Sequence, residues 1–227
     1  MSNALSETIE DYLKAIYQLT TGGRRASTNL IAQRMGVSAA STTAMLQRLA
    51  VSDPPLVDYQ KHHGVLLTPT GERAALEVIR HHRLLETFLC QILGCPWDEV
   101  HAEADRLEHV ISEDLEERIS QVTGNPLRDP HGEPIPNREL SLPAQSNLCL
   151  SDLQPGQRAL VQRIGNPAPA LLRHLASIGL LPDVLVTVVE NSVLQDTVRL
   201  QIAGQSELQV FGLRLAAEIY VVLLHGD

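Results

Sequence analysis

Two short helical segments joined by a glycine turn constrain the fold of this chain most. In TNLIAQRMGVSAASTTAMLQRLA, residues 28–50, apolar positions recur at helical spacing on both sides of Gly36. Thr28 is placed to cap the first segment and Ser38 the second, because a hydroxyl oxygen accepts hydrogen bonds from the free N–H groups at a helix start. A helix, a turn containing glycine and a second helix of these lengths predict a helix-turn-helix.

The residues that follow extend this motif. Short runs at about 56–60 and 64–68 predict two strands joined by a polar turn, and Thr70 is placed to cap a long helix over about 71–94. A hairpin wing and a long helix after a helix-turn-helix indicate DNA binding far more specifically than any piece alone. The small, hydroxylated start of the second helix and the basic wing tip predict DNA contacts at Thr28, Ser38, Ala39, Ala40, Ser41, Thr43, Arg48, Lys61, His62 and His63.

Potential metal ligands gather further along the chain. Residues 98–124 contain no Gly or Pro before the final glycine and are rich in Leu, Ile, Glu and Arg, so they predict a helix that continues to about Val122. Residues three and four apart share a face of a helix that turns about 100° per residue. One face of this helix therefore carries His101, Asp105, Glu108 and His109.

A second pair precedes this face. His82 and Glu86, four residues apart in RHHRLLETFL, share one face of the long helix predicted there. Two antiparallel helices that turn these faces toward each other would offer nitrogen and oxygen ligands suited to a divalent first-row metal. Charged residues at this spacing are more often a solvated helix face, so spacing alone leaves both interpretations open.

Charge is distributed unevenly along the 227 residues, whose formal net charge is −9. Residues 1–70 carry six basic and five acidic side chains, residues 71–145 carry seven and fifteen, and residues 146–227 carry five and seven. The acidic excess lies where a cation would bind, and the segment predicted to bind DNA is spared. This asymmetry fits a DNA-binding N-terminal segment followed by an acidic, metal-binding segment better than a uniformly acidic enzyme.

Cysteine content and hydropathy indicate the compartment. Cys90, Cys95 and Cys149 form neither an even disulfide set nor a CxxC pair, which is typical of a reduced cytosolic protein. Neither a signal peptide nor an apolar run of the ~20 residues that span a membrane is found in the sequence. We therefore expect a cytoplasmic protein.

The character of the chain changes after a polar, proline-rich stretch at 125–143, where His131 is most simply a loop residue. The runs RALVQRI, VLVTVVE, TVRLQIA, ELQVFG and AAEIYVVL predict five short strands, and LRHLASIGLLPD predicts a helix after the first. This content predicts an SH3-like β-barrel. The whole chain is thus expected to be mainly α with β, in three domains: residues 1–70, 71–145 and 146–227.

Several motifs together resemble the diphtheria-toxin-repressor family of metal-dependent transcriptional repressors. They are EDYLKAIYQL, the winged helix-turn-helix, LTPTGERAA, HHRLLETFL, VHAEADRLEHVIS and GNPLRDPHGEPIPN. The resemblance extends over the whole chain and implies a homodimer that binds palindromic operator DNA when metal-loaded and represses metal-uptake genes. It also implies a helical dimerisation domain, whose interface we expect to be built from the apolar faces of the helices around 84–93 and 107–115. It assigns one metal site to Asp11, Asp105, Glu108 and His109, and a neighbouring site to His82, Glu86 and His101.

The resemblance also bears on the metal. The iron-responsive branch has Met and Cys where this chain has Asp11 and Asp105, whereas the manganese-responsive branch has acids, so we expect Mn²⁺ with Fe²⁺ as the second choice. Some manganese members carry Glu at the position of Lys14 and use it to hold a second metal, which Lys14 cannot do. Ala168 and Leu171 stand where the iron branch has ligands from the SH3-like domain, so that domain contributes no ligand or uses His174 instead.

Two other classes of function remain possible on sequence grounds. A hydrolytic metalloenzyme could use the same four ligands, although the chain has no HExxH motif and an enzyme would not need a winged helix-turn-helix. A winged-helix regulator could sense a small organic ligand, with the acidic clusters as solvated faces. The residues of the second helix of the helix-turn-helix differ from those of the family it resembles. The operator sequence of that family is therefore not expected to apply to this chain.

Overall fold

A computed structural model describes residues 5–20, 22–165 and 168–224. The chain has a mixed α/β fold and divides into two compact units, described separately below. The first unit consists of Met1–His82, Glu108–Ile111 and Pro136–Ser141, and the second of Arg83–Leu107, Ser112–Ile135 and Leu142–Asp227.

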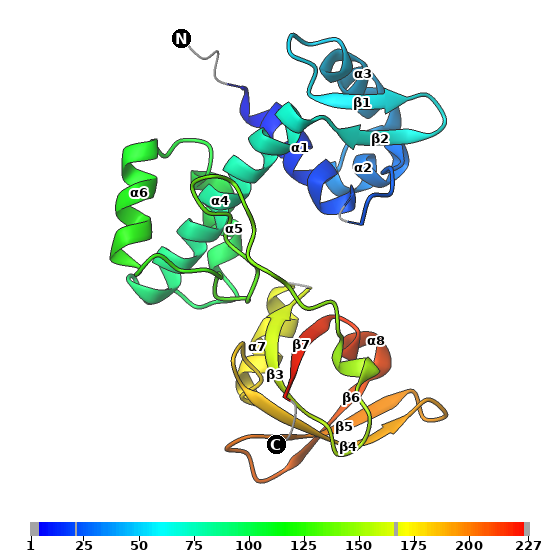
Figure 1. Ribbon diagram of the computed structural model, residues 1–227, viewed down its shortest axis with the longest axis vertical. Coiled ribbons are helices and arrows are strands. Elements are labelled where there is room, and N and C mark those ends of the chain that lie inside the picture. Colours follow the sequence, from blue (N-terminus) through cyan, green and yellow to red (C-terminus); the bar gives the residue numbers. More distant parts are fainter. Residues whose placement is uncertain (1–4, 21, 166–167, 225–227) are drawn as a thin grey trace. The chain divides into compact units, whose positions relative to one another are not determined.

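The winged helix-turn-helix is confirmed in the first unit (Figure 1). Strands β1 and β2 pair antiparallel, with Val57 opposite Leu67 and Gln60 opposite Gly64. Buried side chains of all these elements form one core, including Leu13 and Ile16 of the first helix. The elements in order are α1 (Glu7–Thr20), α2 (Thr28–Met35), α3 (Ala39–Ala50), β1 (Val57–Gln60) and β2 (Gly64–Leu67).

Helix caps explain where these helices begin. Ser27, and not Thr28 as expected, caps α2, because its hydroxyl oxygen accepts a hydrogen bond from the Leu30 N–H at 3.2 Å. Gly36 ends α2 in the left-handed conformation, with φ 66°, which glycine adopts without steric cost. Ser38 caps α3 as expected, accepting from the Ser41 N–H at 3.1 Å.

The helical segment differs from expectation in two respects. Helix α4 (Pro69–Gln91) begins slightly earlier than predicted, because Thr68, and not Thr70 as expected, caps it by accepting a hydrogen bond from the Gly71 N–H. The continuous helix expected through Val122 is wrong: α5 (Val100–Leu107) ends in a turn, and α6 (Glu113–Val122) begins anew. Ser112 caps α6 by accepting from the Leu115 N–H, and acidic residues fill its first turn, where the helix dipole favours them. Glu108 and His109 therefore lie on a turn and not on a helix face.

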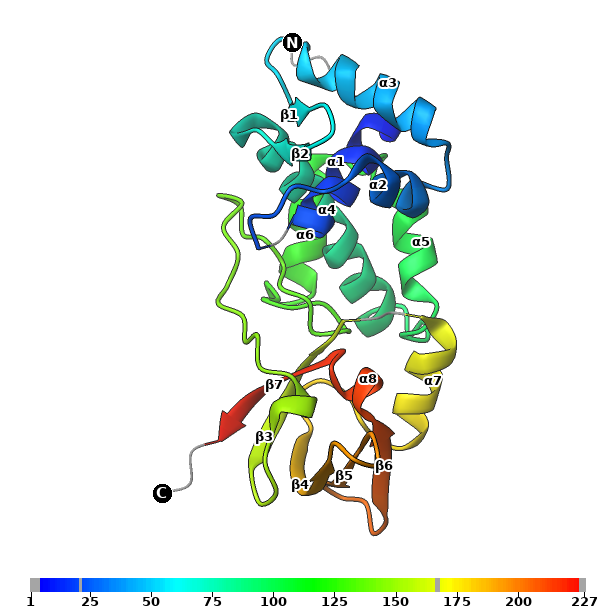
Figure 2. The same cartoon turned by 90° about the vertical axis from the view of Figure 1, so that its right-hand side faces the viewer.

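The C-terminal strands form one antiparallel sheet in the order β6-β5-β4-β3-β7. All five predicted strands are present, but among the described residues β6 and β7 do not pair, so the expected barrel is not closed. Short helix α8 follows β6 directly and leads into β7 (Figure 2). The elements are η1 (Leu150–Asp152), β3 (Arg158–Ile164), α7 (Pro169–Ser177), β4 (Leu185–Ser192), β5 (Thr197–Ile202), β6 (Leu208–Gly212), α8 (Leu213–Ala216) and β7 (Ile219–Leu224).

The core of the second unit is mainly aliphatic, and among the described residues Phe211 is its buried aromatic side chain. Leu150, Val161, Leu172 and Val198 are fully buried in it, and Trp97 packs against its edge. Within the described residues, none of the helices combines the length and the apolar character needed to cross a membrane.

Candidate metal centre

The first group of potential ligands joins helix α1 to the turn after α5. Asp11, Glu108 and His109 offer ligand atoms that all lie within 4.8 Å of one another. Two donors on opposite sides of a first-row metal, each about 2.2 Å from it, lie about 4.4 Å apart, so this spacing suits a common ion. The turn is anchored to α4, because His81 Nδ1 donates to the carbonyl oxygen of Glu108 at 3.1 Å.

His109 is held between acidic side chains. Its Nδ1 lies 2.6 Å from Glu10 Oε2, and its Nε2 lies 3.0 Å from Asp11 Oδ1 and 3.4 Å from Glu108 Oε1. Burial lowers the pKa of His109, but the hydrogen bond to Glu10 and the charges of Glu108, Asp11 and Glu10 outweigh it and raise the pKa above its ordinary value. The raised pKa favours the protonated form of His109 in the metal-free protein, and this form balances part of the acidic charge.

Glu108 is the most buried ligand of this group, with a side chain only 1% exposed. Lys14 Nζ lies 2.9 and 2.7 Å from its two carboxylate oxygens, and His82 Nδ1 lies 2.5 Å from Oε2. Burial raises the pKa of Glu108, but the hydrogen bonds and positive charges of His82 and Lys14 together lower it below its ordinary value. The carboxylate is therefore ionised, as a metal ligand must be.

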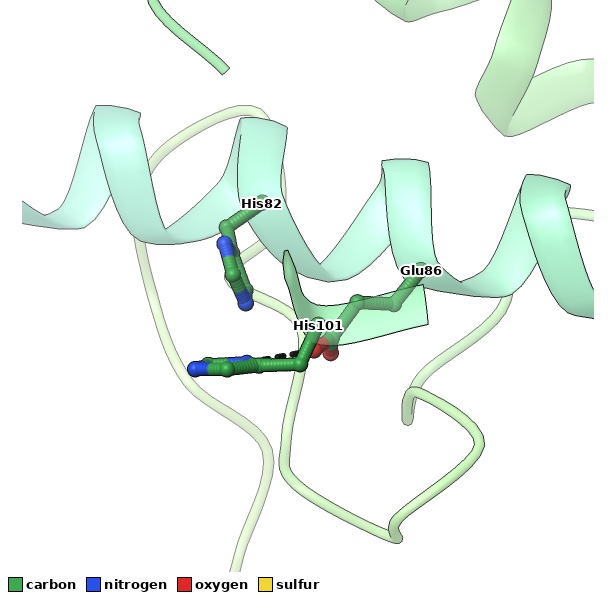
Figure 3. A group of neighbouring side chains, drawn as sticks. All are labelled: His82, Glu86 and His101. Carbon is green, nitrogen blue, oxygen red and sulfur yellow. Dashed lines mark hydrogen bonds and ion pairs between the residues drawn. The ribbon is translucent and has the colours of Figure 1, made fainter. Parts of the chain in front are cut away.

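The second group lies along α4. Figure 3 shows His82 and Glu86 on one side of this helix, with the imidazole of His101 against the Glu86 carboxylate. His101 Nδ1 lies 2.9 Å from Glu86 Oε1, and the three residues offer ligand atoms within 4.8 Å of one another. Asp105 lies one turn further along α5, half-exposed, with its Oδ2 3.7 Å from His101 Nε2. Asp105 therefore lies beside His101 in the second unit.

A third group was not expected from the sequence. Glu86, Asp129 and His131 are all buried, and their ligand atoms also lie within 4.8 Å of one another. His131, expected to be a simple loop residue, has its Nδ1 3.6 Å from Glu86 Oε2. Periodicity could not reveal this group, because two of its members lie in a proline-rich loop. The Asp-Pro-His sequence of that loop was the one available signal.

The loop that carries this third group is held in place by hydrogen bonds and close packing. Asp129 Oδ1 accepts from the N–H groups of His131 and Glu133, and the His131 ring stacks on Trp97 with centroids 5.6 Å apart. A Cβ on Gly132 would lie 1.9 Å from the Gln162 carbonyl oxygen, so only glycine allows the loop to approach β3 this closely.

Burial and neighbouring charges shift the pKa values of Asp129 and His131 in this loop. Burial and the nearby Glu86 charge raise the pKa of Asp129 well above its ordinary value. Burial lowers the pKa of His131, but the hydrogen bond to Glu86 and the charges of Glu86 and Asp129 raise it to about 9.

The donors fit a divalent cation. All the groups consist of carboxylate oxygens and imidazole nitrogens, and within the described residues none contains a cysteine. Such donors suit Mn²⁺, Fe²⁺ or Zn²⁺ better than Cu⁺, which prefers sulfur. His174, considered above as a ligand from the C-terminal segment, is exposed on α7 and belongs to none of the groups in the described part of the chain.

The residues expected to contact DNA lie on the surface of the first unit. Ser38, Ala39, Ala40 and Ser41 at the start of α3 are exposed, and Thr28 and Thr43 are half-buried. Arg48 is exposed on the same helix, and Lys61, His62 and His63 form the exposed tip of the β1–β2 hairpin. His62 adopts a left-handed φ of 68° that turns the hairpin.

Three family models match successive parts of the chain. The N-terminal DNA binding domain of the iron dependent repressors matches residues 4–65, and their metal binding and dimerisation domain matches residues 68–137. The FeoA domain matches residues 148–223.

Individual relatives agree with these models. Over 199 residues the chain is 35% identical to the iron-dependent repressor IdeR of Mycobacterium tuberculosis, covering 82% of this chain and 85% of that protein. It is 37% identical over 135 residues to the diphtheria toxin repressor of Corynebacterium diphtheriae, which is 58% of each chain. A solved structure of a manganese-dependent transcriptional repressor in complex with manganese matches 95% of this chain and 100% of its own, with 39% identity and a TM-score of 0.85.

The converging carboxylates and imidazoles, the winged helix-turn-helix and these matches lead to one conclusion. The chain belongs to the iron-dependent repressor family, which includes the diphtheria toxin repressor, and is a metal-dependent, DNA-binding transcriptional repressor and not an enzyme.

Proposed function

We propose that this repressor responds to Mn²⁺ and binds a palindromic operator as a homodimer, repressing genes for metal uptake. The observation that carries the proposal is the convergence of Asp11, Glu108 and His109, because it connects the DNA-reading motif to the acidic turn after α5. The proposed ligands are Asp11, Asp105, Glu108 and His109 for one site and His82, Glu86 and His101 for its neighbour.

Helix α1 links the ligands to DNA reading. Leu13 and Ile16 on one side of α1 are fully buried in the core of the winged helix-turn-helix, while Asp11 faces His109. In the metal-free protein the Asp11 and Glu108 carboxylates repel each other, with His109 between them. A divalent cation supplies positive charge at this point when bound, so it favours the position of α1 in which these ligands meet.

The donor set supports Mn²⁺ over Fe²⁺. Asp11 and Asp105 are hard oxygen donors, a ligand type that suits Mn²⁺ relative to softer metals. Because Mn²⁺ binds most weakly in the divalent series, its selection also depends on coordination geometry and metal availability. A relative whose structure contains manganese supports the same choice. Fe²⁺ is the second candidate, because the curated relatives are named iron-dependent repressors.

Dimerisation is supported by the apolar surface of the helical segment. Within the stretches proposed for the interface, Ile92, Leu93, Val110 and Leu115 are between 45% and 67% exposed. Large apolar side chains at this exposure favour an interface, here between two copies of residues 71–145. Two winged helix-turn-helix domains, residues 1–70 of each copy, would then face the half-sites of a palindrome, with residues 146–227 as a separate FeoA-like domain.

Fluorescence anisotropy of labelled DNA tests the proposal. Chelator-treated protein is titrated onto DNA from its own promoter region with Mn²⁺, anaerobic Fe²⁺ or Zn²⁺, at constant salt because salt sets non-specific binding. We expect tight DNA binding only when metal is present. Mn²⁺ should produce it at a low free concentration, although this ion binds most ligands weakly. Binding of equal strength without metal would refute a metal-responsive repressor, and a response confined to Fe²⁺ would favour the second candidate.

A further inference from the structure

Lys14 holds a position next to the ligands of the first group that no metal role explains. It lies one turn after Asp11 on α1, and its side chain is only 12% exposed. Its ammonium nitrogen lies 2.7 Å from Glu108 Oε2, 2.9 Å from Glu108 Oε1 and 3.0 Å from His82 Nδ1. Both partners are proposed metal ligands, so the lysine contacts side chains that a metal would also use.

The contacts of Lys14 differ from those of a surface ion pair. Glu108 has a side chain 1% exposed and His82 one 6% exposed, so water does not compete strongly for them. When Nδ1 of His82 carries a proton it donates to Glu108, and when it does not its lone pair accepts from Lys14. In either state Lys14 keeps both oxygens of the Glu108 carboxylate.

We propose that Lys14 is an internal cation that competes with the metal for Glu108 and His82 and so sets the metal concentration at which the repressor responds. This inference rests on the proposed function, since it assumes that Glu108 is a metal ligand. Lys14 satisfies the buried carboxylate while the site holds no metal. A metal ion must then share Glu108 with the ammonium group or displace it, and it meets a positive charge that opposes binding.

The two effects of Lys14 have opposite signs, which distinguishes competition from simple structural support. Removing its charge leaves the buried Glu108 with fewer partners, so the metal-free protein becomes less stable. The same change removes a competitor and a repelling charge, so the metal binds more tightly. A substitution that merely damages the fold would weaken both stability and binding.

The test uses Lys14→Met, which keeps the length and apolar stem of the side chain, and Lys14→Gln as a second neutral variant. Mn²⁺ affinity is measured from the electron paramagnetic resonance signal of free aqueous Mn²⁺ in chelator-treated full-length protein, and thermal unfolding is measured without metal. We expect the Kd for Mn²⁺ to fall about tenfold or more in both variants, because an opposing charge within a few ångströms is removed. We expect the metal-free melting temperature to fall.

Lys61→Met is the matched control, because Lys61 is the other lysine of the chain and lies on the exposed wing tip. Its Mn²⁺ affinity and metal-free melting temperature should equal those of the wild type. Unchanged or weaker Mn²⁺ binding in whichever Lys14 variant folds would overturn the role of Lys14. A wild-type protein that binds no Mn²⁺ would instead refute the proposed function, so the two failures are distinguishable.

Discussion

At the scale of single residues, His109 shows how the metal-free protein manages a concentration of acid. Both of its ring nitrogens lie within hydrogen-bond distance of a carboxylate, on Glu10 and on Asp11. Only the doubly protonated ring can donate to both at once. The same Nε2 is the atom that would bind a metal, and a metal needs the neutral ring. Proton and metal therefore compete at His109.

This competition predicts a pH dependence. The pKa of His109 is raised above its ordinary value, so its proton stabilises the metal-free fold below that ordinary value, and this stabilisation is lost as the pH rises through the raised pKa. Mn²⁺ should accordingly raise the melting temperature more at about pH 8 than at about pH 6. Thermal unfolding with and without Mn²⁺ measures this. His174→Gln, at an exposed histidine on α7, should leave the difference unchanged, and equal Mn²⁺ shifts at both pH values would contradict the prediction.

Asp105 offers a second test at this scale. Its side chain is half-exposed, so Asp105→Ala should leave the metal-free melting temperature close to that of the wild type. If Asp105 is a ligand, the variant should lose Mn²⁺-dependent operator binding in the anisotropy assay. Glu103→Ala, on the same helix and paired with Arg106, is the control that should keep the response. A wild-type metal response in Asp105→Ala would remove this residue from the ligand set.

How far single residues can be predicted depends on their local pattern. His82 and Glu86 lie at helical spacing, so their shared face follows from periodicity, whereas Asp11 and the grouping of His101 with this pair followed from the family resemblance. Asp129 and His131 were missed because the path of a loop is determined by contacts distant in sequence. Here the contact is the hydrogen bond from the Ile164 N–H to the His131 carbonyl oxygen, together with the close approach of Gly132 to β3.

At the scale of elements, the break between α5 and α6 places the ligands. Glu108 and His109 lie on the turn that the break creates, and this turn returns to α1. Helix propensity alone favoured one long helix, because the segment lacks Gly and Pro. The competing signal was Ser112 followed by Glu113, Asp114 and Glu116, a capping sequence within a helical run. The five C-terminal strands were predicted because each has its own branched pattern, whereas closure depends on whether the two edge strands, β6 and β7, pair.

Removing the cap at the start of α6 should measurably destabilise the protein. Ser112→Ala removes the hydroxyl that accepts from the Leu115 N–H, so it should lower the free energy of unfolding by about 1 kcal/mol. Urea unfolding followed by circular dichroism at helical wavelengths measures this. Ser206→Ala, in an exposed turn, should change stability little. If the two variants were equally stable, the Ser112 cap would not be what starts α6.

At the scale of the whole molecule, a protein with a negative net charge must bind negatively charged DNA. The net charge of −9 opposes DNA binding in general, but the first 70 residues carry six basic and five acidic side chains. Exposed Arg48 and Lys61 belong to this segment. Local charge is thus sufficient for phosphate contacts, while the acidic remainder repels DNA from the rest of the surface.

Salt dependence should reveal these contacts. Lys61→Ala should weaken Mn²⁺-dependent binding to all DNA sequences alike and reduce the slope of log affinity against log salt by about 1, because one phosphate contact is lost. Anisotropy titrations at several salt concentrations measure the slope. Arg199→Ala, at a half-exposed arginine of β5, is the control that should leave the slope unchanged. An unaltered slope for Lys61→Ala would remove the wing tip from the DNA interface.

The stacking of Trp97 on His131 gives the molecule an optical probe of its own. The chain has a single tryptophan, so all of its indole emission arises beside the Glu86, Asp129 and His131 group. A protonated imidazole withdraws excited-state electron density from an indole in contact with it and dims the emission. Displacement of the proton or rearrangement of the ring would brighten it. The state of this loop is therefore visible in unlabelled protein, in real time and in the presence of DNA.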